Sequence, residues 1–363
     1  MRTVRLLLGP RSYDIVIGEG TLDTLDTLLP FAGLGDASAF AVVADRATGP
    51  AIERTLKALE RTGLPVHSIV LAIDERLKSA AGLDALYDRF IAEGLDRHSV
   101  IVALGGGVVG DLAGYAAATF VRGVRWIGIP TTLLAAVDSA IGGKTAINHA
   151  RGKNLIGAIH QPSLVVVDRT TFATLPAREI VSGYGEMLKY GLALDRRLWN
   201  DLIMMAPASV GDVQIERCVA RKAAIVATDE RDVSGEREVL NFGHTIGHAI
   251  ESATNYGYYR HGEAVILGMR AALHLSHARG HLAPDVLQTV DAQLAGVAVP
   301  PLPPLDRETL VDAISRDKKK GSGGRTRFVL LRSIGQTLAD DRVESKQIRA
   351  SLDFLESACA SPS

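Results

Sequence analysis

The sequence predicts an α/β domain with a mostly parallel, Rossmann-like sheet, followed by an all-α domain. Strand and helix patterns alternate along the chain up to about Pro176. Such alternation is typical of a parallel sheet with helices on both faces. After Pro176, apolar residues recur at helical spacing and strand patterns nearly vanish. We therefore expect two domains, residues 1–177 and residues 178–363.

The first half predicts an opening hairpin and then strands that alternate with helices. The hairpin is expected because a Gly-Pro turn separates two short apolar runs. Among the later strands, Val100–Leu104 is a continuous apolar run, which is typical of a buried strand. The expected strands are Val4–Leu8, Tyr13–Ile17, Ala39–Ala44, Val66–Leu71, Val100–Leu104, Arg125–Ile129 and Ser163–Val167, and the expected helices are Ala51–Thr62, Leu83–Glu93 and one starting at Asp111.

Amphipathic patterns predict that the second half is helical. The proline-rich stretch Ala298–Pro304 is expected to be a rigid, non-helical connector. One short strand is expected at Arg327–Leu331. The expected helices are Arg178–Gly191, Ile215–Asp229, Glu238–Thr254, Gly262–Ala278, Asp285–Leu294 and Glu344–Glu356.

Composition excludes several classes of protein. The chain has 363 residues and a formal net charge of -1, so no overall field attracts nucleic acid or an anionic membrane. It has no apolar run of about 18 residues and no signal-peptide pattern at its start. Cys218 and Cys359 are too few for a disulfide framework. We therefore expect a cytoplasmic protein that binds neither nucleic acid nor membranes.

The glycine turn after Val100–Leu104 is the first candidate for a binding site. Gly105–Gly107 end the apolar run, and a helix pattern follows. Glycines at such a junction let the backbone approach a pyrophosphate, and the helix N-terminus offers free N–H groups. A tight strand-to-helix turn would give the same sequence, and the turn alone does not separate the two interpretations.

Polar residues follow two other predicted strands. Asp45 ends one apolar run, where its carboxylate could bind a ribose hydroxyl or cap a helix. Thr131 and Thr132 follow another strand end and are expected to face the same cleft, or to cap a turn. Ligands of open α/β sheets bind beyond the carboxyl ends of the strands, so these positions are candidates for cofactor contacts.

A cluster of histidines predicts a metal site. His244 and His248 are four residues apart and share one face of a helix, and His261 follows shortly after. Glu186 and Lys189 are three apart and also share a face. Three imidazoles and a carboxylate could hold a divalent ion, and this donor set suits zinc. Ordinary polar helix faces would look similar, and spacing alone does not show which histidines bind.

Basic residues are candidates for binding an anionic substrate. No glycine stands five residues before Gly143, where a P-loop would need its first one, so the Gly-Gly-Lys-Thr sequence is not a P-loop. Each lysine or arginine could instead be a solvated surface charge. The candidates are Lys144, Lys153, Lys222, Arg237 and the run Lys318–Lys320, with Asn154 beside Lys153.

Taken together, the motifs resemble one known family, the 3-dehydroquinate synthases. The resemblance extends from about Tyr13 to Gly335 and keeps the family's motif order. Gly185 departs from it, because the family often has alanine there. The matching motifs are Leu104–Gly114, Phe120–Gly123, Ile129–Ala135, Val137–Thr145, Gly152–Ala158, Gly185–Gly191, Asp229–Arg231, Leu240–Glu251 and His261–Val265.

The resemblance implies a carbon–oxygen lyase of the shikimate pathway, a homodimer that uses NAD and Zn²⁺, with Co²⁺ as a possible substitute. The implied substrate is a phosphorylated sugar acid, 3-deoxy-D-arabino-heptulosonate 7-phosphate, which becomes 3-dehydroquinate and phosphate. The implied steps are transient oxidation by NAD, phosphate elimination, reduction, ring opening and aldol closure. Another sugar-phosphate cyclase and a metal-dependent polyol dehydrogenase are the alternatives.

The resemblance also implies roles for individual residues. Glu186, His244 and His261 match the family's zinc ligands. Arg122 matches an arginine that reaches the phosphate site of the neighbouring subunit. The match leaves His248 either as a residue that supports the metal ligands or as a substrate contact. The residues that match substrate contacts are Asp138, Lys144, Asn154, Lys189, Lys222, Arg237, Asn241 and one of Lys318 and Lys319. The NAD contacts are expected at Asp45, Glu75, Lys78, Gly106, Gly107, Val108, Asp111, Thr131, Thr132, Lys144, Lys153, Thr174 and Leu175.

Overall fold

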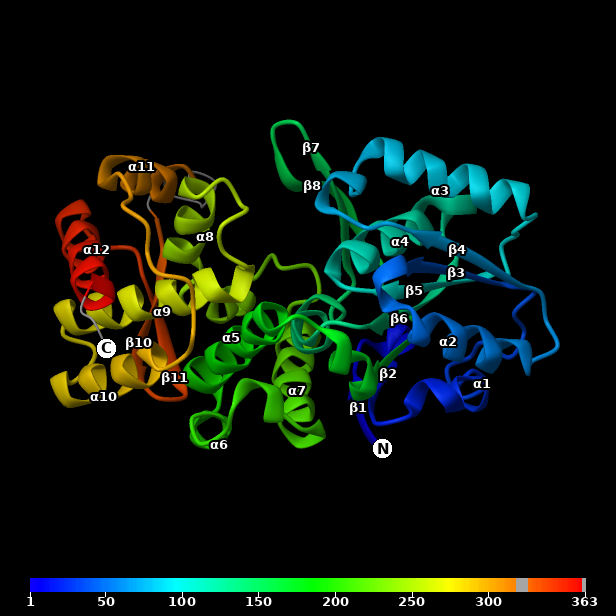
Figure 1. Ribbon diagram of the computed structural model, residues 1–363, viewed down its shortest axis with the longest axis horizontal. Coiled ribbons are helices and arrows are strands. Elements are labelled where there is room, and N and C mark those ends of the chain that lie inside the picture. The colour runs from blue at the N-terminus through cyan, green and yellow to red at the C-terminus, as the bar shows by residue number, and fades with distance from the viewer. Residues whose placement is uncertain (318–325, 361–363) are drawn as a thin grey trace. The chain divides into compact units, whose positions relative to one another are not determined.

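The computed structural model describes residues 1–317 and 326–360 (Figure 1). The chain divides into two compact units. The first unit is Met1–Leu175 together with Gly211–Arg231, and the second is Pro176–Val210 together with Asp232–Ser363. The division expected after residue 177 differs from this in one respect. The segment Gly211–Arg231 was expected in the helical half, but it packs with the α/β unit.

A seven-stranded sheet forms the centre of the first unit. Its first two strands form the predicted antiparallel hairpin, and every other neighbouring pair is parallel. In spatial order the strands are β1 (Arg2–Leu6), β2 (Tyr13–Gly18), β9 (Leu164–Asp168), β6 (Arg125–Pro130), β5 (Val100–Gly105), β3 (Phe40–Asp45) and β4 (Val66–Leu71). The predicted, mostly parallel sheet is confirmed.

Both faces of the centre of this sheet are buried, which explains why β3, β5 and β9 are nearly continuous apolar runs. Val42 and Val102 lie in one apolar cluster, and their neighbours Val43 and Ile101 lie in another on the opposite face. Helices cover both faces, as Figure 1 shows. They are α1 (Leu25–Leu28) and α2 (Pro50–Glu60) on one face and α3 (Ala80–Ala92) and α4 (Gly107–Thr119) on the other, with α7 (Asp212–Thr228) packed on β1.

A second, smaller sheet in the first unit is absent from the sequence prediction. Strands β7 (Lys144–His149) and β8 (Gly152–Ile159) form an antiparallel hairpin. Most residues of β8 are exposed, so its sequence lacks the apolar face by which strands are recognised. This hairpin carries three of the predicted site residues, Lys144, Lys153 and Asn154.

The second unit is mainly helical. Its helices are α5 (Ala177–Leu194), α6 (Arg196–Leu202), α8 (His244–Ala253), α9 (His261–Ala278), α10 (Pro284–Ala295), α11 (Arg307–Asp317) and α12 (Ser345–Ala360). The single strand expected near Arg327–Leu331 is one arm of a hairpin of β10 (Phe328–Ser333) and β11 (Gln336–Asp340). Gly335 lies in the turn between these two strands, and its φ of +89° favours glycine there. Because of this hairpin, the second unit is not wholly helical.

Helix α9 forms the core of the second unit. It is buried along almost its whole length and packs against α5, α8, α10 and α12. Its first residue is His261, so one candidate metal ligand lies at the end of the most enclosed helix. In the part of the chain that the structure describes, no helix combines the length and the hydropathy needed to cross a membrane.

Candidate functional site

Three helices of the second unit bring the predicted metal ligands together. Glu186 lies in the middle of α5, His244 and His248 on the first two turns of α8, and His261 at the start of α9. Donor nitrogens of the three histidines lie within 4.8 Å of one another. Oε1 of Glu186 is 3.5 Å from Nε2 of His244 and 3.5 Å from Nε2 of His261.

Glu186 is a fully buried carboxylate that the fold keeps charged. Its side chain has no exposed surface, and Nζ of the equally buried Lys189 lies 2.5 Å from Oε2. Neither oxygen accepts a hydrogen bond of normal geometry. Burial opposes ionisation, but Lys189, His244 and His261 outweigh it and hold the pKa of Glu186 well below its usual range. A buried carboxylate without hydrogen bonds is unusual unless a ligand satisfies it.

The two histidines nearest to Glu186 differ in protonation. Burial lowers the pKa of His244 to about 3, although the charge of Glu186 opposes this, so its imidazole is neutral at pH 7. Burial acts in the same direction on His261, but the neighbouring carboxylates of Glu186 and Glu251 outweigh it and raise its pKa to about 10. Metal ligation requires a neutral imidazole, so binding of an ion would displace a proton from His261.

The arrangement fits a zinc-type ion. An ionised, buried carboxylate and imidazole nitrogens are the donors that such sites use. The structure brings together Glu186, His244 and His261, and it also places His248 within reach of the two other histidines. On geometry alone, a three-histidine set and a Glu-His-His set are both available.

The sequence reasoning gave no role to Glu251, which contacts the cluster. Its Oε2 lies 3.4 Å from Nδ1 of His261. Glu251 is on α8, three residues after His248 and seven after His244, so all three share one face of the helix. That spacing was the available signal. A carboxylate on the far ring nitrogen of a ligating histidine fixes the orientation of the ring.

In the first unit, the predicted nucleotide residues lie where the order of the strands reverses. After β3 the chain continues to β4 on one side, whereas β5 borders β3 on the other side and leads on to β6. Asp45 ends β3, and Gly105 ends the parallel neighbour β5. Open α/β sheets bind ligands beyond the carboxyl ends of strands at such a reversal.

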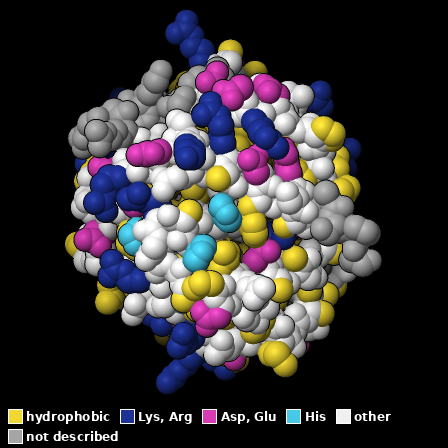
Figure 2. Space-filling view, turned by 90° about the vertical axis from the view of Figure 1, so that its left-hand side faces the viewer, with side chains coloured by type: hydrophobic (Ala, Val, Ile, Leu, Met, Phe, Trp, Pro, Cys, Tyr) yellow, Lys and Arg dark blue, Asp and Glu magenta, His cyan; other side chains and the backbone are white. Residues whose placement is uncertain are grey.

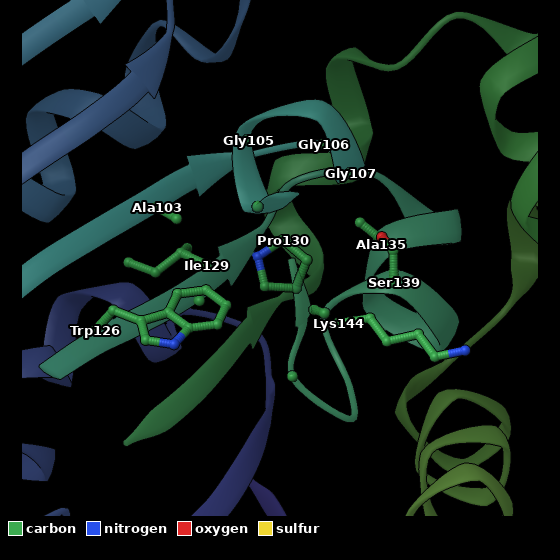
Figure 3. Close-up of a pocket in the computed structure, with 14 residues that line it drawn as sticks. Ala103, Gly105, Gly106, Gly107, Trp126, Ile129, Pro130, Ala135, Ser139 and Lys144 are labelled. Atoms are coloured by element: carbon green, nitrogen blue, oxygen red, sulfur yellow. The ribbon is translucent and has the colours of Figure 1, made fainter. Parts of the chain in front are cut away.

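The glycine turn brings bare backbone to this position. Gly106 precedes α4 and offers no side-chain cap to its N–H groups. A Cβ atom at Gly106 would lie 3.2 Å from Cγ2 of Thr132, and one at Gly107 would lie 3.1 Å from Oγ of Ser139. Figure 3 shows the pocket beside this turn, whose lining includes Gly105–Gly107, Ile129, Pro130, Ser139 and Lys144. Such a cradle fits a pyrophosphate at the helix N-terminus.

The polar residues near the other strand ends serve as caps in the structure. Oδ1 of Asp45 accepts the N–H of Ala47, at 3.0 Å. Oγ1 of Thr132 accepts the N–H of Ala135, and the N–H of Thr131 donates to the carbonyl of Gly105. The capping interpretation therefore holds for Asp45 and Thr132, and their role toward a cofactor stays a prediction.

Several residues predicted to contact NAD or the substrate are engaged with one another in the first unit. The buried ammonium of Lys78 donates to Asp111 and to Asn154. Burial raises the pKa of Asp111, and the charge of Lys78 opposes this rise without cancelling it. Glu75 accepts a 2.7 Å hydrogen bond from Asn148 of β7. This network joins the start of α3, α4 and the β7–β8 hairpin.

Lys222 and Asp138 form a second, partly buried ion pair in the first unit. Lys222 lies on α7, and its Nζ is 2.6 Å from Oδ1 and 2.6 Å from the carbonyl oxygen of Asp138. Asp138 lies in the short helical segment Ala135–Ser139. Two predicted substrate contacts that are 84 residues apart in the chain therefore meet, because α7 packs with the α/β unit.

The remaining predicted residues are placed individually. Arg237 is buried and Asn241 is exposed, both in Glu236–Asn241, the segment before α8. Arg122 is exposed, with φ of +71°. Val108 lies in the first turn of α4, and Thr174 and Leu175 lie at the end of the segment that follows β9. Lys318 and Lys319 fall outside the described residues.

Comparisons with known proteins cover both units. A model of the 3-dehydroquinate synthase N-terminal family matches residues 68–182, and one of the C-terminal family matches residues 183–320. The chain is 41% identical over 363 residues to the 3-dehydroquinate synthase of a Synechococcus species, covering 97% of this chain and 98% of that protein. It is 45% identical to the enzyme from Caulobacter vibrioides over 369 residues, with coverages of 97% and 98%.

Solved structures show the same fold. A 2-epi-5-epi-valiolone synthase from Streptomyces hygroscopicus, solved with NAD⁺ and Zn²⁺, is 26% identical with a TM-score of 0.82, covering 98% of this chain and 99% of that chain. Its lower identity, set against the matches to both halves and to relatives above 40%, makes the narrower assignment clear. The chain belongs to the 3-dehydroquinate synthase family.

Proposed function

We propose that the protein converts 3-deoxy-D-arabino-heptulosonate 7-phosphate to 3-dehydroquinate and phosphate. One observation carries the proposal: in a member of this family, the ionised and buried Glu186 lies beside His244 and His261. A buried charge of this kind is costly without a ligand.

The metal is proposed to be Zn²⁺, with Co²⁺ as a substitute, held by Glu186, His244 and His261. When bound there, such an ion polarises a substrate oxygen as a Lewis acid. The family pattern uses only Glu186, His244 and His261 as metal ligands, so His248, on the same helix face as His244, is assigned to the substrate. Glu251 holds the ring of His261 in place from its far side.

The proposed redox cofactor is NAD, held at the reversal between β3 and β5. NAD held there would supply reversible hydride transfer, so the oxidation would be transient and no net NADH would be formed. Gly106, Gly107 and the free N–H groups at the start of α4 are the proposed pyrophosphate contacts. Asp45, at the end of β3, is the proposed ribose contact.

The charged side chains are proposed to hold the substrate phosphate and to favour its elimination. Lys144, Asn154, Lys222 and Arg237 are hydrogen-bond donors, and charge-assisted bonds to phosphate are strong. Asp138 fixes the ammonium of Lys222 from one side. A ketone next to the carbon that loses its proton acidifies that C–H bond, and the phosphate's own oxygen accepts the proton as phosphate leaves.

Two proposed contacts concern a second copy of the chain and the lysine run. Arg122 is exposed and lies in a segment whose backbone holds it at positive φ. We assign it to the phosphate of a neighbouring subunit in a homodimer. One of Lys318 and Lys319 is assigned to the substrate on the basis of the family pattern alone.

The test is a reaction with purified protein, the heptulosonate phosphate, a catalytic amount of NAD, and Zn²⁺. Phosphate and dehydroquinate should appear in equal amounts, with no net NADH. Absence of phosphate release would contradict the proposal, and sedoheptulose 7-phosphate would then test for another cyclase. Net NADH accumulation with a polyol would instead identify a dehydrogenase.

A further inference from the structure

We propose that backbone contacts at glycines beside the ligands set the spacing of the metal site before any ion binds. This inference rests on the proposed metal site and concerns how the fold builds it. The contacts join α9 to α5 and to α8, the two other helices that carry ligands. In this view Gly185, Gly247 and Gly262 are positioning residues that act through Glu186 and the histidines.

Helices α5 and α9 touch through their backbones at one pair of glycines. A Cβ atom at Gly185 would lie 2.4 Å from the carbonyl oxygen of Gly262. One at Gly262 would lie 1.8 Å from the carbonyl oxygen of Ser182. The N–H of Gly262 donates to Oγ of Ser182, at 3.0 Å. In this chain no alanine fits either position unless the two helices move apart.

Helices α8 and α9 touch in the same way. A Cβ atom at Gly268 would lie 2.0 Å from the carbonyl oxygen of Gly243, and one at Gly247 would lie 3.0 Å from the carbonyl oxygen of Ala264. Gly243 also has φ of +79°, which favours glycine. Backbones approach this closely only where both surfaces lack side chains.

Each of the four candidate metal ligands, Glu186, His244, His248 and His261, is the immediate neighbour of a contact glycine. The pairs along the chain are Gly185 with Glu186, Gly243 with His244, Gly247 with His248, and Gly262 with His261. A backbone contact one residue away therefore fixes the backbone of each candidate metal ligand. Because this contact involves no flexible side chain, it cannot adjust by a change of rotamer. A lysine or leucine at such a contact could change rotamer, but two touching backbones cannot.

The buried carboxylate shows what this rigidity achieves. Both oxygens of Glu186 are buried without a hydrogen bond of normal geometry, and Oε1 stays 3.5 Å from Nε2 of both His244 and His261. The fold thus holds a charged donor beside two imidazoles without help from a bound ion. Metal–ligand distances tolerate deviations of only about 0.2 Å, so a displacement of a few tenths of an ångström between helices would weaken binding.

The test uses full-length protein freed of metal and titrated with Co²⁺, whose visible absorption reports the ligand geometry. Gly247→Ala, with the smaller overlap, should weaken Co²⁺ binding by about tenfold. Gly185→Ala, with the larger overlap, should weaken it by about 100-fold and alter the absorption spectrum. The thermal unfolding midpoint of the metal-free protein is measured in parallel.

Gly191→Ala is the matched control. Gly191 is on α5 as well, and a Cβ atom there would lie 2.9 Å from Cα of Trp199 on α6, away from the ligands. It should lower the unfolding midpoint while leaving the Co²⁺ affinity within about twofold and the spectrum unchanged. Binding by Gly185→Ala and Gly247→Ala that equals the wild type would overturn the inference. If Gly185→Ala does not fold, Gly247→Ala decides.

A loss of Co²⁺ affinity in the control equal to that of Gly247→Ala would also overturn the inference, because the effect would then be general destabilisation. Failure of the wild type to bind Co²⁺ is a different result. It would contradict the proposed metal site itself, and it is recognised before any variant is compared.

Discussion

The two units use glycine for opposite purposes. In the first unit, Gly106 and Gly107 keep the turn before α4 free of side chains, so that backbone N–H groups face a pocket. In the second unit, Gly185 and Gly262 bring two helices into backbone contact and leave no space. In the first unit the glycines leave space for a ligand. In the second unit they allow close helix contacts that fix the distances between the proposed ligands of one ion. Glycine content alone would not distinguish these two uses, but the neighbouring elements do.

The largest effect is expected in the second unit, at Glu186, the charged ligand of the proposed metal site. Glu186→Gln removes the buried negative charge, and we expect loss of Zn²⁺ binding and a fall in kcat of about 1000-fold or more, since a Lewis acid supplies several kcal/mol. Metal content and turnover are measured together. Glu251→Gln leaves Glu186 and the three histidines unchanged, and it should weaken metal binding by about 10-fold to 100-fold. Full activity of metal-stripped protein would remove the metal from the mechanism.

On the first unit the largest effect is expected at Lys144. Its side chain is exposed and belongs to the pocket lining, so Lys144→Ala should not change stability (Figure 3). We expect kcat to fall by about 100-fold, because one preorganised donor to the substrate is lost. The dissociation constant for NAD, measured by fluorescence titration of NADH, should change much less. An unchanged rate would exclude Lys144 from the site.

Gly106→Ala tests the ligand-facing use of glycine directly. The added methyl group would lie 3.2 Å from Cγ2 of Thr132, close enough to displace the turn slightly. We expect NADH to bind about tenfold more weakly, because the N–H groups of α4 no longer meet the pyrophosphate well. The Co²⁺ spectrum should stay that of the wild type. A changed Co²⁺ spectrum with unchanged NADH binding would contradict the role of Gly106 in binding the cofactor.

The smallest effect is a purely structural one in the second unit. Burial opposes ionisation of Asp340, but the N–H of Arg342, His281 and Arg279 outweigh it and lower its pKa to about 2. A lowered pKa contributes stability that is present above the unfolded-state pKa of about 3.9 and is lost as pH falls toward about 2. Asp340→Asn should therefore reduce the free energy of unfolding by about 2 kcal/mol at pH 7.

The dependence on pH gives this prediction its check. Denaturant unfolding at pH 7 and at pH 3 should show the difference between wild type and Asp340→Asn narrowing at the lower pH. At pH 3 the carboxylate of the unfolded wild type has taken up a proton, whereas that of the folded wild type is still mostly ionised, so unfolding is favoured by proton uptake. Co²⁺ binding at pH 7 should not change. A constant difference at both pH values would contradict the assigned pKa.

The surface of the second unit carries charges of both signs, so it does not create a strong field of one sign. Figure 2 shows basic and acidic side chains interspersed over the view, among the residues that the structure describes. The net charge of the whole chain is -1. Fields from such mixed charges are screened within about 10 Å at moderate salt. The pKa shifts of the buried Glu186 and Asp340 have causes of another kind, namely burial and the charged or hydrogen-bonding groups beside each carboxylate.

Much of the fold could be predicted because burial leaves a clear pattern. Val100–Gly105 is a strand enclosed on both faces, so its sequence is a continuous apolar run. The hairpin of β7 and β8 leaves no such pattern, because most residues of β8 face solvent. Helix α7 was expected from its amphipathic sequence. Such a pattern predicts that one face is buried, but it does not show which part of the protein covers that face. Its place in the first unit follows only from the structure.

The candidate site was partly predictable for a similar reason. Helical spacing places His244 and His248 on one face, and extending it by one turn reaches Glu251. No local spacing relates Glu186 to His261, which are 75 residues apart and meet only through the contact of α5 with α9. The sequence likewise shows Gly185 and Gly262 without showing that they face each other.

The membership of α7 in the first unit affects the order in which the protein can fold during synthesis. Residues 176–210, with helices α5 and α6, leave the ribosome before α7 does. Until α7 follows, β1 lacks the helix that packs on it, and Asp138 lacks Lys222. Domains of nascent chains generally fold as units from the N-terminus. Here the N-terminal unit has to wait for residue 231, so a stop codon after residue 177 would leave it without its last helix.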